Sequence, residues 1–219
     1  MCYPFSMNNE TNTTNALSDD NAPFGINRIP LITFEDHTEN LELRNVKDEY
    51  RAMFNDEISA DIDTKRVPMV SVCMNLTSDF NKASIIRANN AFAGSDVIIA
   101  GKKKFDRRGT VGSHHYEHLR HHNDVNVIID ALKEDGYTLF AVDNTPEFNP
   151  EVIYDFKFPE KSAFFYGEEQ KGLDTDVVAQ CDHCVYIPQF GSVRSINVAQ
   201  AASVVMSEYS RQMRFADNS

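Results

Sequence analysis

Strand and helix patterns alternate along the chain from residue 69 onward, and this alternation constrains the fold more than any other feature. Short apolar runs typical of buried strands occupy residues 69–74, 95–100, 138–142, 162–166 and 184–187. Helical patterns occupy residues 81–93, 125–135, 174–180 and 195–214. Strands that alternate with helices usually pair in parallel, because each connection crosses over the sheet. The sequence therefore predicts an α/β fold, a largely parallel sheet with helices on both faces.

The chain has 219 residues, enough for one full domain with additional sequence. We assign that domain to residues 67–214. Residues 1–30 include a polar run of Asn, Thr and Glu, and we expect them to form a disordered tail. Residues 31–66 carry ten acidic and five basic side chains, with apolar residues at near-helical spacing. We expect an acidic helical extension there that packs on the domain.

The N-terminus lacks a basic start followed by an apolar run, and no stretch approaches the roughly 18 apolar residues of a membrane span. We therefore expect a cytoplasmic protein without a membrane segment. Cys181 and Cys184 form a single C-x-x-C pair, and a zinc site would need a second ligand pair. Cys2 and Cys73 do not supply that spacing, so we predict no metal site.

The net charge of −12 at first argues against a nucleic-acid partner, because Lys and Arg contacts to phosphate supply most non-specific affinity. The distribution of charge reverses this argument. Residues 81–122 carry eight basic side chains against three acidic ones, and five of the seven histidines. We predict an RNA-binding face there, formed by Lys102, Lys103, Lys104, Arg107 and Arg108. The alternative is a solvated charged loop.

A histidine-rich run follows between Gly112 and His122. His118 stands four residues from His114 and from His122, a metal-binding spacing on a helix, but the run offers no obvious carboxylate partner. We interpret this run as a loop and strand that face RNA, with Tyr116 available to stack on a base.

The glycine pattern disfavours a dinucleotide-binding fold. A Gly-x-Gly-x-x-Gly sequence after the first strand is absent, and Asp79-Phe80-Asn81 occupies that turn. The glycines that would let the backbone approach a ligand come late, at Gly167, Gly172 and Gly191. A nucleotide-dependent oxidoreductase is therefore disfavoured, and we expect the ligand site in the last third of the chain.

Three short motifs occur in a fixed order. They are Asn81-Lys82-Ala83-Ser84-Ile85-Ile86-Arg87, then Gly167-Glu168-Glu169-Gln170-Lys171-Gly172-Leu173, then Ile187-Pro188 followed by Gly191-Ser192-Val193-Arg194-Ser195-Ile196-Asn197-Val198. Together they resemble the signatures of the SpoU class (TrmH-like) of SPOUT RNA methyltransferases, N-x-G-x-I-x-R, G-x-E-x-x-G-L and I-P-…-G-x-x-x-S-L-N-V. The chain departs from the pattern at Ala83, Ala88 and Ile196, where the family usually has Gly, Thr and Leu.

The resemblance implies a C-terminal trefoil knot, the alpha/beta knot of the SPOUT fold, whose loops hold S-adenosylmethionine. It implies methyl transfer from this cofactor to a ribose 2′-hydroxyl of structured RNA, either tRNA or rRNA. It also implies a homodimer, which the apolar stripe of the final helix supports, because such a stripe needs a surface to cover it. The alternative is an RNA-binding protein of the same fold without catalysis.

The resemblance further assigns residues to roles. Those expected to be catalytic are Arg87, Asn81, Glu169, Ser195 and Asn197. Those expected to bind the cofactor are Gly167, Ile187, Pro188, Ser195 and Ile196. A guanidinium is a poor base at neutral pH, so we expect Arg87 to clamp phosphate and to stabilise the developing oxyanion.

Overall fold

A computed structural model describes residues 26–34, 45–168 and 171–215. These residues contain a seven-stranded sheet of order β3-β2-β1-β6-β4-β7-β5. Its strands are β1 (Val67–Met74), β2 (Gly94–Ala100), β3 (His118–His122), β4 (Thr138–Val142), β5 (Glu151–Val152), β6 (Ser162–Tyr166) and β7 (His183–Tyr186). Every neighbouring pair of these strands is parallel. The predicted parallel sheet is therefore confirmed.

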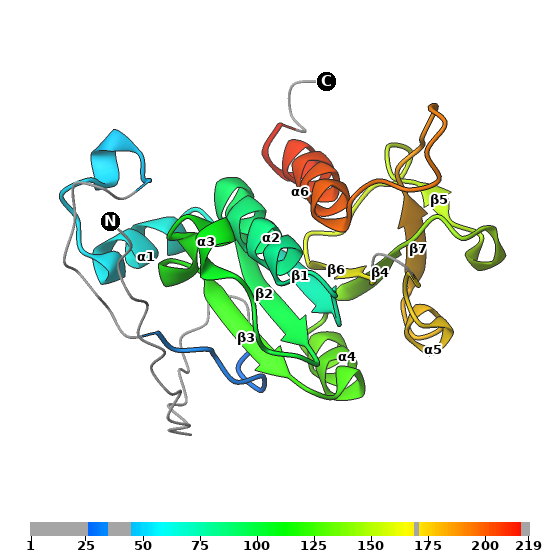
Figure 1. The fold of residues 1–219 in the computed structure, drawn as a ribbon, viewed down its shortest axis with the longest axis horizontal. Helices are drawn as coiled ribbons and strands as arrows, with labels where there is room; N and C mark the ends of the chain where they lie inside the picture. The colour runs from blue at the N-terminus through cyan, green and yellow to red at the C-terminus, as the bar shows by residue number, and fades with distance from the viewer. Residues whose placement is uncertain (1–25, 35–44, 169–170, 216–219) are drawn as a thin grey trace, which may run out of the picture.

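Helices cover both faces of the sheet (Figure 1). They are α1 (Asn55–Asp63), α2 (Asp79–Phe92), α3 (Arg107–Thr110), α4 (Val125–Glu134), α5 (Thr175–Val178) and α6 (Val198–Phe215). Apolar side chains of α2 and α6 form one core with Met69 and Cys73 of β1. Side chains of α4 and α5 form the other core with Val70 and Val72. Successive side chains of β1 thus enter opposite cores, as the pleat of a strand requires.

The last helix begins three residues later than predicted, at Val198 and not at Ser195. The Asn197 side chain accepts hydrogen bonds from the backbone N–H groups of Ala199, at 2.9 Å, and Gln200, at 3.4 Å. Asn197 is therefore the N-cap of α6, because its carboxamide satisfies N–H groups of the first turn. Ser195, Ile196 and Asn197 therefore belong to the loop that follows β7.

Residues 26–30 do not belong to a disordered tail, so the predicted tail boundary at residue 30 is wrong. Ile26 and Ile29 are completely buried in the core that contains Val70. The carbonyl of Pro30 accepts a hydrogen bond from His121 N–H at 3.1 Å, which holds this segment along β3. Two isoleucines in a polar sequence supply enough apolar surface to anchor it. Residues 1–25 lie outside the described residues.

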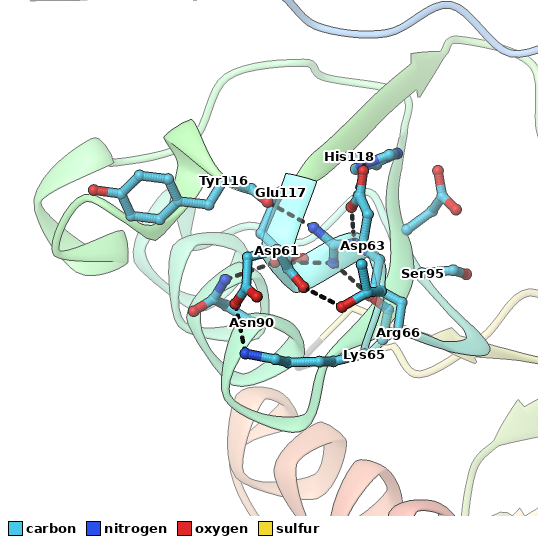
Figure 2. A network of polar contacts seen from close by, with 12 residues as sticks. Asp61, Asp63, Lys65, Arg66, Asn90, Ser95, Tyr116, Glu117 and His118 are labelled. Carbon is cyan, nitrogen blue, oxygen red and sulfur yellow. Dashed lines mark hydrogen bonds and ion pairs between the residues drawn. The ribbon is translucent and has the colours of Figure 1, made fainter. Parts of the chain in front are cut away.

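The helix α1 lies within the acidic segment and is joined to the sheet through Arg66 (Figure 2). The fully buried Arg66 side chain donates to Asp63 at 2.7 Å and to the carbonyl of Gly94 at 2.6 Å. Its ion pair with the equally buried Glu117 measures 3.2 Å. This network fixes the end of α1 against β2 and the start of β3. The residues between 35 and 44, also assigned to the helical extension, lie outside the described residues.

Candidate functional site

A cavity of about 260 Å³ lies at the carboxyl ends of β4, β6 and β7, where α/β sheets usually bind ligands. The loops that follow these strands and the start of α6 form its walls. The lining residues are Val142, Asp143, Asn144, Thr145, Tyr166, Gly167, Glu168, Lys171, Gly172, Tyr186, Ile187, Gln189, Arg194, Ser195, Ile196, Val198 and Ala201. A larger hollow between the ends of α2 and α6 contains none of the predicted site residues. The strand-end cavity is therefore the candidate site.

Four of the five residues predicted to bind a cofactor line this cavity, namely Gly167, Ile187, Ser195 and Ile196. The fifth, Pro188, does not line it, although its neighbours Ile187 and Gln189 do. The structure thus brings together residues from two of the three motifs.

Two glycines shape the wall formed by residues 167–172. A Cβ atom on Gly167 would lie 2.3 Å from the carbonyl carbon of Gly172, so no larger side chain fits. Gly172 has a φ of +72°, a conformation that favours glycine. Gly191 differs, because its surroundings are open and a Cβ atom there would meet nothing within 4 Å. Gly167 and Gly172 are thus required by neighbouring protein atoms, whereas Gly191 is not, and the approach of these three glycines to a ligand stays a prediction.

Asp143, which the sequence analysis did not single out, connects two loops of the cavity. One carboxylate oxygen accepts hydrogen bonds from the backbone N–H and the hydroxyl of Thr145, at 2.9 and 2.6 Å. The other accepts from Leu173 N–H at 3.1 Å. An Asp at a strand end with a Thr two residues later is a sequence signal for such a side-chain-to-backbone turn. The bond to Leu173, 30 residues away, needed the structure.

A hydrogen bond joins the starts of α2 and α6. Asn197 Nδ2 donates to Asn81 Oδ1 at 3.1 Å, across 116 residues of sequence. Ser195 and Ile196, which immediately precede Asn197, line the cavity. The first and third motifs therefore meet here, at the edge of the cavity. Glu169 of the second motif lies outside the described residues.

Arg87 is exposed on α2 and makes no hydrogen bond or ion pair with any described residue. Six residues separate it from Asn81, which places the two side chains about 120° apart around the helix. Arg87 is on the helical face that includes Phe80 and Ala83. Those two residues pack on Gly109 of α3, so this face of α2 is turned toward α3, and Arg87 does not line the cavity.

Two bases counted toward the RNA-binding face are buried and structural. The Lys82 ammonium donates to the carbonyls of Lys102 and Lys104 at 3.1 and 2.5 Å. Arg120 is 2 % exposed and pairs with Asp96 at 2.6 Å. The basic segment is therefore less cationic at its surface than the sequence indicates. Lys82 nevertheless fixes the backbone of the lysine-rich loop against the first turn of α2.

The five residues predicted to bind RNA are all exposed. Arg108 forms a two-bonded ion pair with Asp106, at 3.0 and 2.7 Å, which neutralises much of its charge. The Arg107 guanidinium lies 5.1 Å from the centre of the Phe34 ring. The three consecutive lysines at 102–104 are the remaining cations, and two of them approach Asp79 only to 4.0 Å.

Tyr116 is not available to stack on a base, so this part of the interpretation is wrong. Tyr116 is 5 % exposed and packs in a small core with Tyr50, Ile58 and Ile62. His114 is buried too, and that burial, with His115 and Arg107 nearby, lowers its pKa to about 4. The described residues contain no cluster of three or more His, Cys, Asp or Glu suited to a metal ion.

Comparisons with a protein family, with curated proteins and with solved structures all match this chain to RNA methyltransferases of one class. Residues 68–207 match the SpoU rRNA Methylase family. The tRNA (guanosine(18)-2′-O)-methyltransferase of Borreliella burgdorferi is 32 % identical over 144 residues, covering 64 % of this chain and 63 % of that protein. The SpoU methyltransferase AviRb from Streptomyces viridochromogenes, solved with AdoMet, is 27 % identical with a TM-score of 0.60, covering 68 % of this chain and 62 % of that one.

The TrmH/SpoU tRNA modifying enzyme of A. aeolicus has a TM-score of 0.67 at 18 % identity, covering 74 % of this chain and 84 % of that one, and it supports the fold alone. The chain spans less than two thirds of the Borreliella protein that it matches. In the part of the chain that the structure describes, no helix is long and apolar enough to cross a bilayer. By its matched residues and its fold, the chain belongs to the SpoU rRNA Methylase family.

Proposed function

We propose that the protein transfers a methyl group from S-adenosylmethionine to a ribose 2′-hydroxyl of structured RNA. The observation that carries this proposal is the hydrogen bond between Asn197 and Asn81. It joins the cavity to the helix that carries Arg87. On the same helix, Lys82 holds the exposed lysine loop through the carbonyls of Lys102 and Lys104. The helix α2 thus connects to the cavity through Asn81, to the lysine loop through Lys82, and carries the unpaired guanidinium of Arg87 further along.

The cavity suits the cofactor in shape and chemistry. Its volume is slightly below the roughly 300 Å³ at which small-molecule sites begin, which fits a nucleoside held in the cavity with a flexible tail at the opening. Val142, Ile187, Ile196 and Val198 supply apolar walls for a purine ring. Gly167 allows the backbone of Gly172 to pack against it, which shapes this wall of the cavity. When bound, S-adenosylmethionine supplies the methyl group on its sulfonium.

The chain's own groups would position the RNA. The Arg87 guanidinium makes no bond to a described residue, so it is available to clamp a phosphate and to stabilise negative charge on the 2′-oxygen. Asn81 and Asn197 fix the two helix starts between the cavity and that arginine. Holding a donor and an acceptor in line supplies much of the rate of such a transfer. We retain Ser195 and Glu169 as catalytic residues by resemblance alone.

The substrate class follows from the names of relatives, which include tRNA (guanosine(18)-2′-O)-methyltransferases and a 23S rRNA (uridine(2479)-2′-O)-methyltransferase. We propose tRNA or rRNA as the substrate. A cytoplasmic location is part of the same proposal, because tRNA and rRNA act in translation there.

We also propose the trefoil knot and the homodimer of the family. The knot is supported by the strand order, since β7 lies outside β4 while α6 returns to pack on α2 and β1. On this return the carbonyl of Arg194 accepts a hydrogen bond from Asn144 Nδ2 at 3.0 Å. The apolar stripe of α6 does not support the dimer, because Ala202, Val205 and Tyr209 are already covered by the chain's own core.

The test is mass mapping of ribose methylation in RNA from cells with and without this protein. The proposal expects one or a few 2′-O-methyl nucleotides to disappear in the deleted strain. Unchanged ribose methylation, together with intact RNA binding, would favour the RNA-binding alternative. A thermal shift with S-adenosylhomocysteine and none with NAD would separate the proposal from an oxidoreductase.

A further inference from the structure

The loop between β7 and α6 presents an aromatic ring to solvent. Phe190 is 97 % exposed, more than any other large hydrophobic side chain of the described residues. Val193 on the same loop is 62 % exposed, and a Cβ atom on Gly191 would meet nothing within 4 Å. The tip of the loop extends away from the end of β7 (Figure 1). A ring with this exposure contributes almost nothing to the hydrophobic core of the described residues.

Both ends of this loop are fixed at the cavity. Gln189, immediately before Phe190, and Arg194, immediately after Val193, line the cavity. The carbonyl of Arg194 accepts a hydrogen bond from Asn144 Nδ2 at 3.0 Å, and Asn144 lines the cavity too. Residues 190–193 therefore project beside the cavity, because the residues on either side of them belong to its wall.

The place of the ring matters because of what must reach the cavity. With the methyl donor bound there, the acceptor ribose has to enter the opening, and a nucleotide drawn into a site loses stacking on its neighbours. Proteins that bind unstacked RNA bases commonly place them on aromatic side chains. Tyr166 and Tyr186 of the cavity are buried and half-buried, and the half-exposed Phe80 ring lies against Gly109. Phe190 is the aromatic ring beside the cavity with the most open surface.

The charged side chains at the cavity favour a polyanion. Asp143, Glu168, Lys171 and Arg194 line it. The two carboxylates accept hydrogen bonds from neighbouring protein groups. Lys171 and Arg194 are exposed and form no ion pair with a described residue. Free cations next to an exposed ring match the phosphates and the base of one nucleotide.

The apolar surface of the loop is too small to hold a second copy of the chain by itself. A stable interface buries about 800 Å² on each partner. One phenylalanine buries about 150–250 Å², and Val193 adds a smaller side chain. A single base, in contrast, covers one face of a single ring.

We infer that the Phe190 ring stacks on the base of the nucleotide whose ribose is methylated, with Lys171 and Arg194 near the adjoining phosphates. This inference rests on the proposed function, since it takes RNA as the substrate of the cavity. Phe190 is a substrate-binding residue in this assignment and takes no part in moving the methyl group or the proton. The stack holds a nucleotide without reading its identity, because every base has a π face.

The test measures methyl transfer by the wild type, Phe190→Leu and Phe190→Trp to a transcript that contains the mapped nucleotide. Leucine keeps an apolar side chain without a ring, and tryptophan keeps an aromatic face. Phe215→Leu is the matched control, because this 60 % exposed ring lies at the far end of α6, about 25 Å along the helix from Val198 in the cavity wall. Calorimetry with S-adenosylhomocysteine and analytical ultracentrifugation accompany each variant.

We expect Phe190→Leu to raise the KM for RNA about fivefold or more, the lower end of the range for one lost base–aromatic stack. The kcat at saturating RNA should stay that of the wild type, because only binding is lost. Phe190→Trp should retain the wild-type KM. A transcript with an abasic target nucleotide should raise the KM of the wild type and raise that of Phe190→Leu no further. The control should match the wild type.

Other results would overturn the inference. An unchanged KM in Phe190→Leu would leave the ring without a role in RNA binding. A loss of equal size on the abasic transcript would show that the ring contacts something other than the target base. Weaker S-adenosylhomocysteine binding would assign the loop to the cofactor, and a changed oligomeric state would assign it to a second copy of the chain. If the wild type methylates no RNA, the proposed function fails, a result distinct from these because each of them leaves the wild type active.

Discussion

At the scale of single residues, burial separates arginines that hold the fold from an arginine that is available to a ligand. The Arg66 side chain is fully buried against Glu117, and that of Arg120 is 3 % exposed against Asp96. Removing one partner of such a pair typically costs about 3–5 kcal/mol. Arg87 is exposed and makes no such pair with a described residue. Residue counts along a sequence cannot make this distinction, because burial depends on contacts between distant segments.

The clearest consequence at this scale concerns Arg87→Ala. We expect methyl transfer to fall by at least about 100-fold, because stabilisation of the oxyanion is lost. Binding of S-adenosylhomocysteine should be unchanged, since Arg87 does not line the cavity. Arg87→Lys should restore little, because an ammonium lacks the planar fork of a guanidinium. Arg51→Ala, which removes an exposed ion pair with Asp48 and does not touch the cavity lining, is the control. Weakened cofactor binding with full turnover would contradict this role.

A second consequence is a pH dependence that originates at His114. Burial, with repulsion from His115 and Arg107, lowers its pKa from 6.5 to about 4. Between these values the unfolded chain binds a proton that the folded chain excludes, so stability is full above pH 6.5 and falls toward pH 4. The contribution is up to roughly 3 kcal/mol.

His114→Gln removes the titrating ring, so its free energy of unfolding should change less than that of the wild type over this pH range. Urea denaturation at about pH 4.5 and about pH 7.5 measures the difference. Parallel pH dependence in the two proteins would mean that His114 does not carry this effect.

At the scale of secondary-structure elements, the sequence predicted the central strands best. The strands at residues 138–142 and 162–166 match their predicted bounds, because continuous apolar runs form buried strands on both faces. β3 was harder to predict, since Arg120 and three histidines make it look like a polar surface segment. The two-residue β5 and the four-residue α3 are too short to carry a periodic signal.

The candidate site likewise has features that the sequence predicts and features that only the structure shows. Motif spacing identified four residues of the cavity, but it could not show that Asn81 and Asn197 bond to each other across the fold. Nor could it show which of the late glycines is sterically required.

Gly167→Ala tests the loop that closes the cavity. A Cβ atom at this position would collide with the backbone of Gly172 and displace the wall. We expect S-adenosylhomocysteine affinity to fall more than about tenfold, which corresponds to about 1.4 kcal/mol. Gly191→Ala is the matched control, because a Cβ atom there meets nothing within 4 Å. Equal affinities in the two variants would show that the 167–172 loop does not form the cofactor site.

At the scale of the whole molecule, an acidic protein carries a small cationic surface. The net charge is −12, yet Lys102, Lys103 and Lys104 are exposed and consecutive on a loop that Lys82 anchors to α2. Such a surface can attract RNA locally while the remainder of the molecule repels it. A cationic surface of this small size favours a compact RNA target over non-specific binding along an extended RNA.

Replacing the three lysines with glutamine should weaken RNA binding and reduce its dependence on salt. The log–log slope should flatten by roughly 0.7 to 0.9 for each phosphate contact that is lost. Arg108→Gln should change the slope less, because its charge is paired with Asp106. S-adenosylhomocysteine affinity should remain that of the wild type in both variants. An unchanged slope in the triple variant would make the lysine loop a solvated segment and place RNA elsewhere.

The central claim is that one continuous site transfers methyl from S-adenosylmethionine to a ribose oxygen. The most direct measurement uses labelled S-adenosylmethionine and an RNA transcript that contains the mapped nucleotide, beside the same transcript with a 2′-deoxynucleotide at that position. Removing the single hydroxyl leaves the base and the phosphates intact. We predict label in the ribose transcript and none in the deoxy transcript. Equal label in both, or in neither, would contradict ribose methylation by this protein.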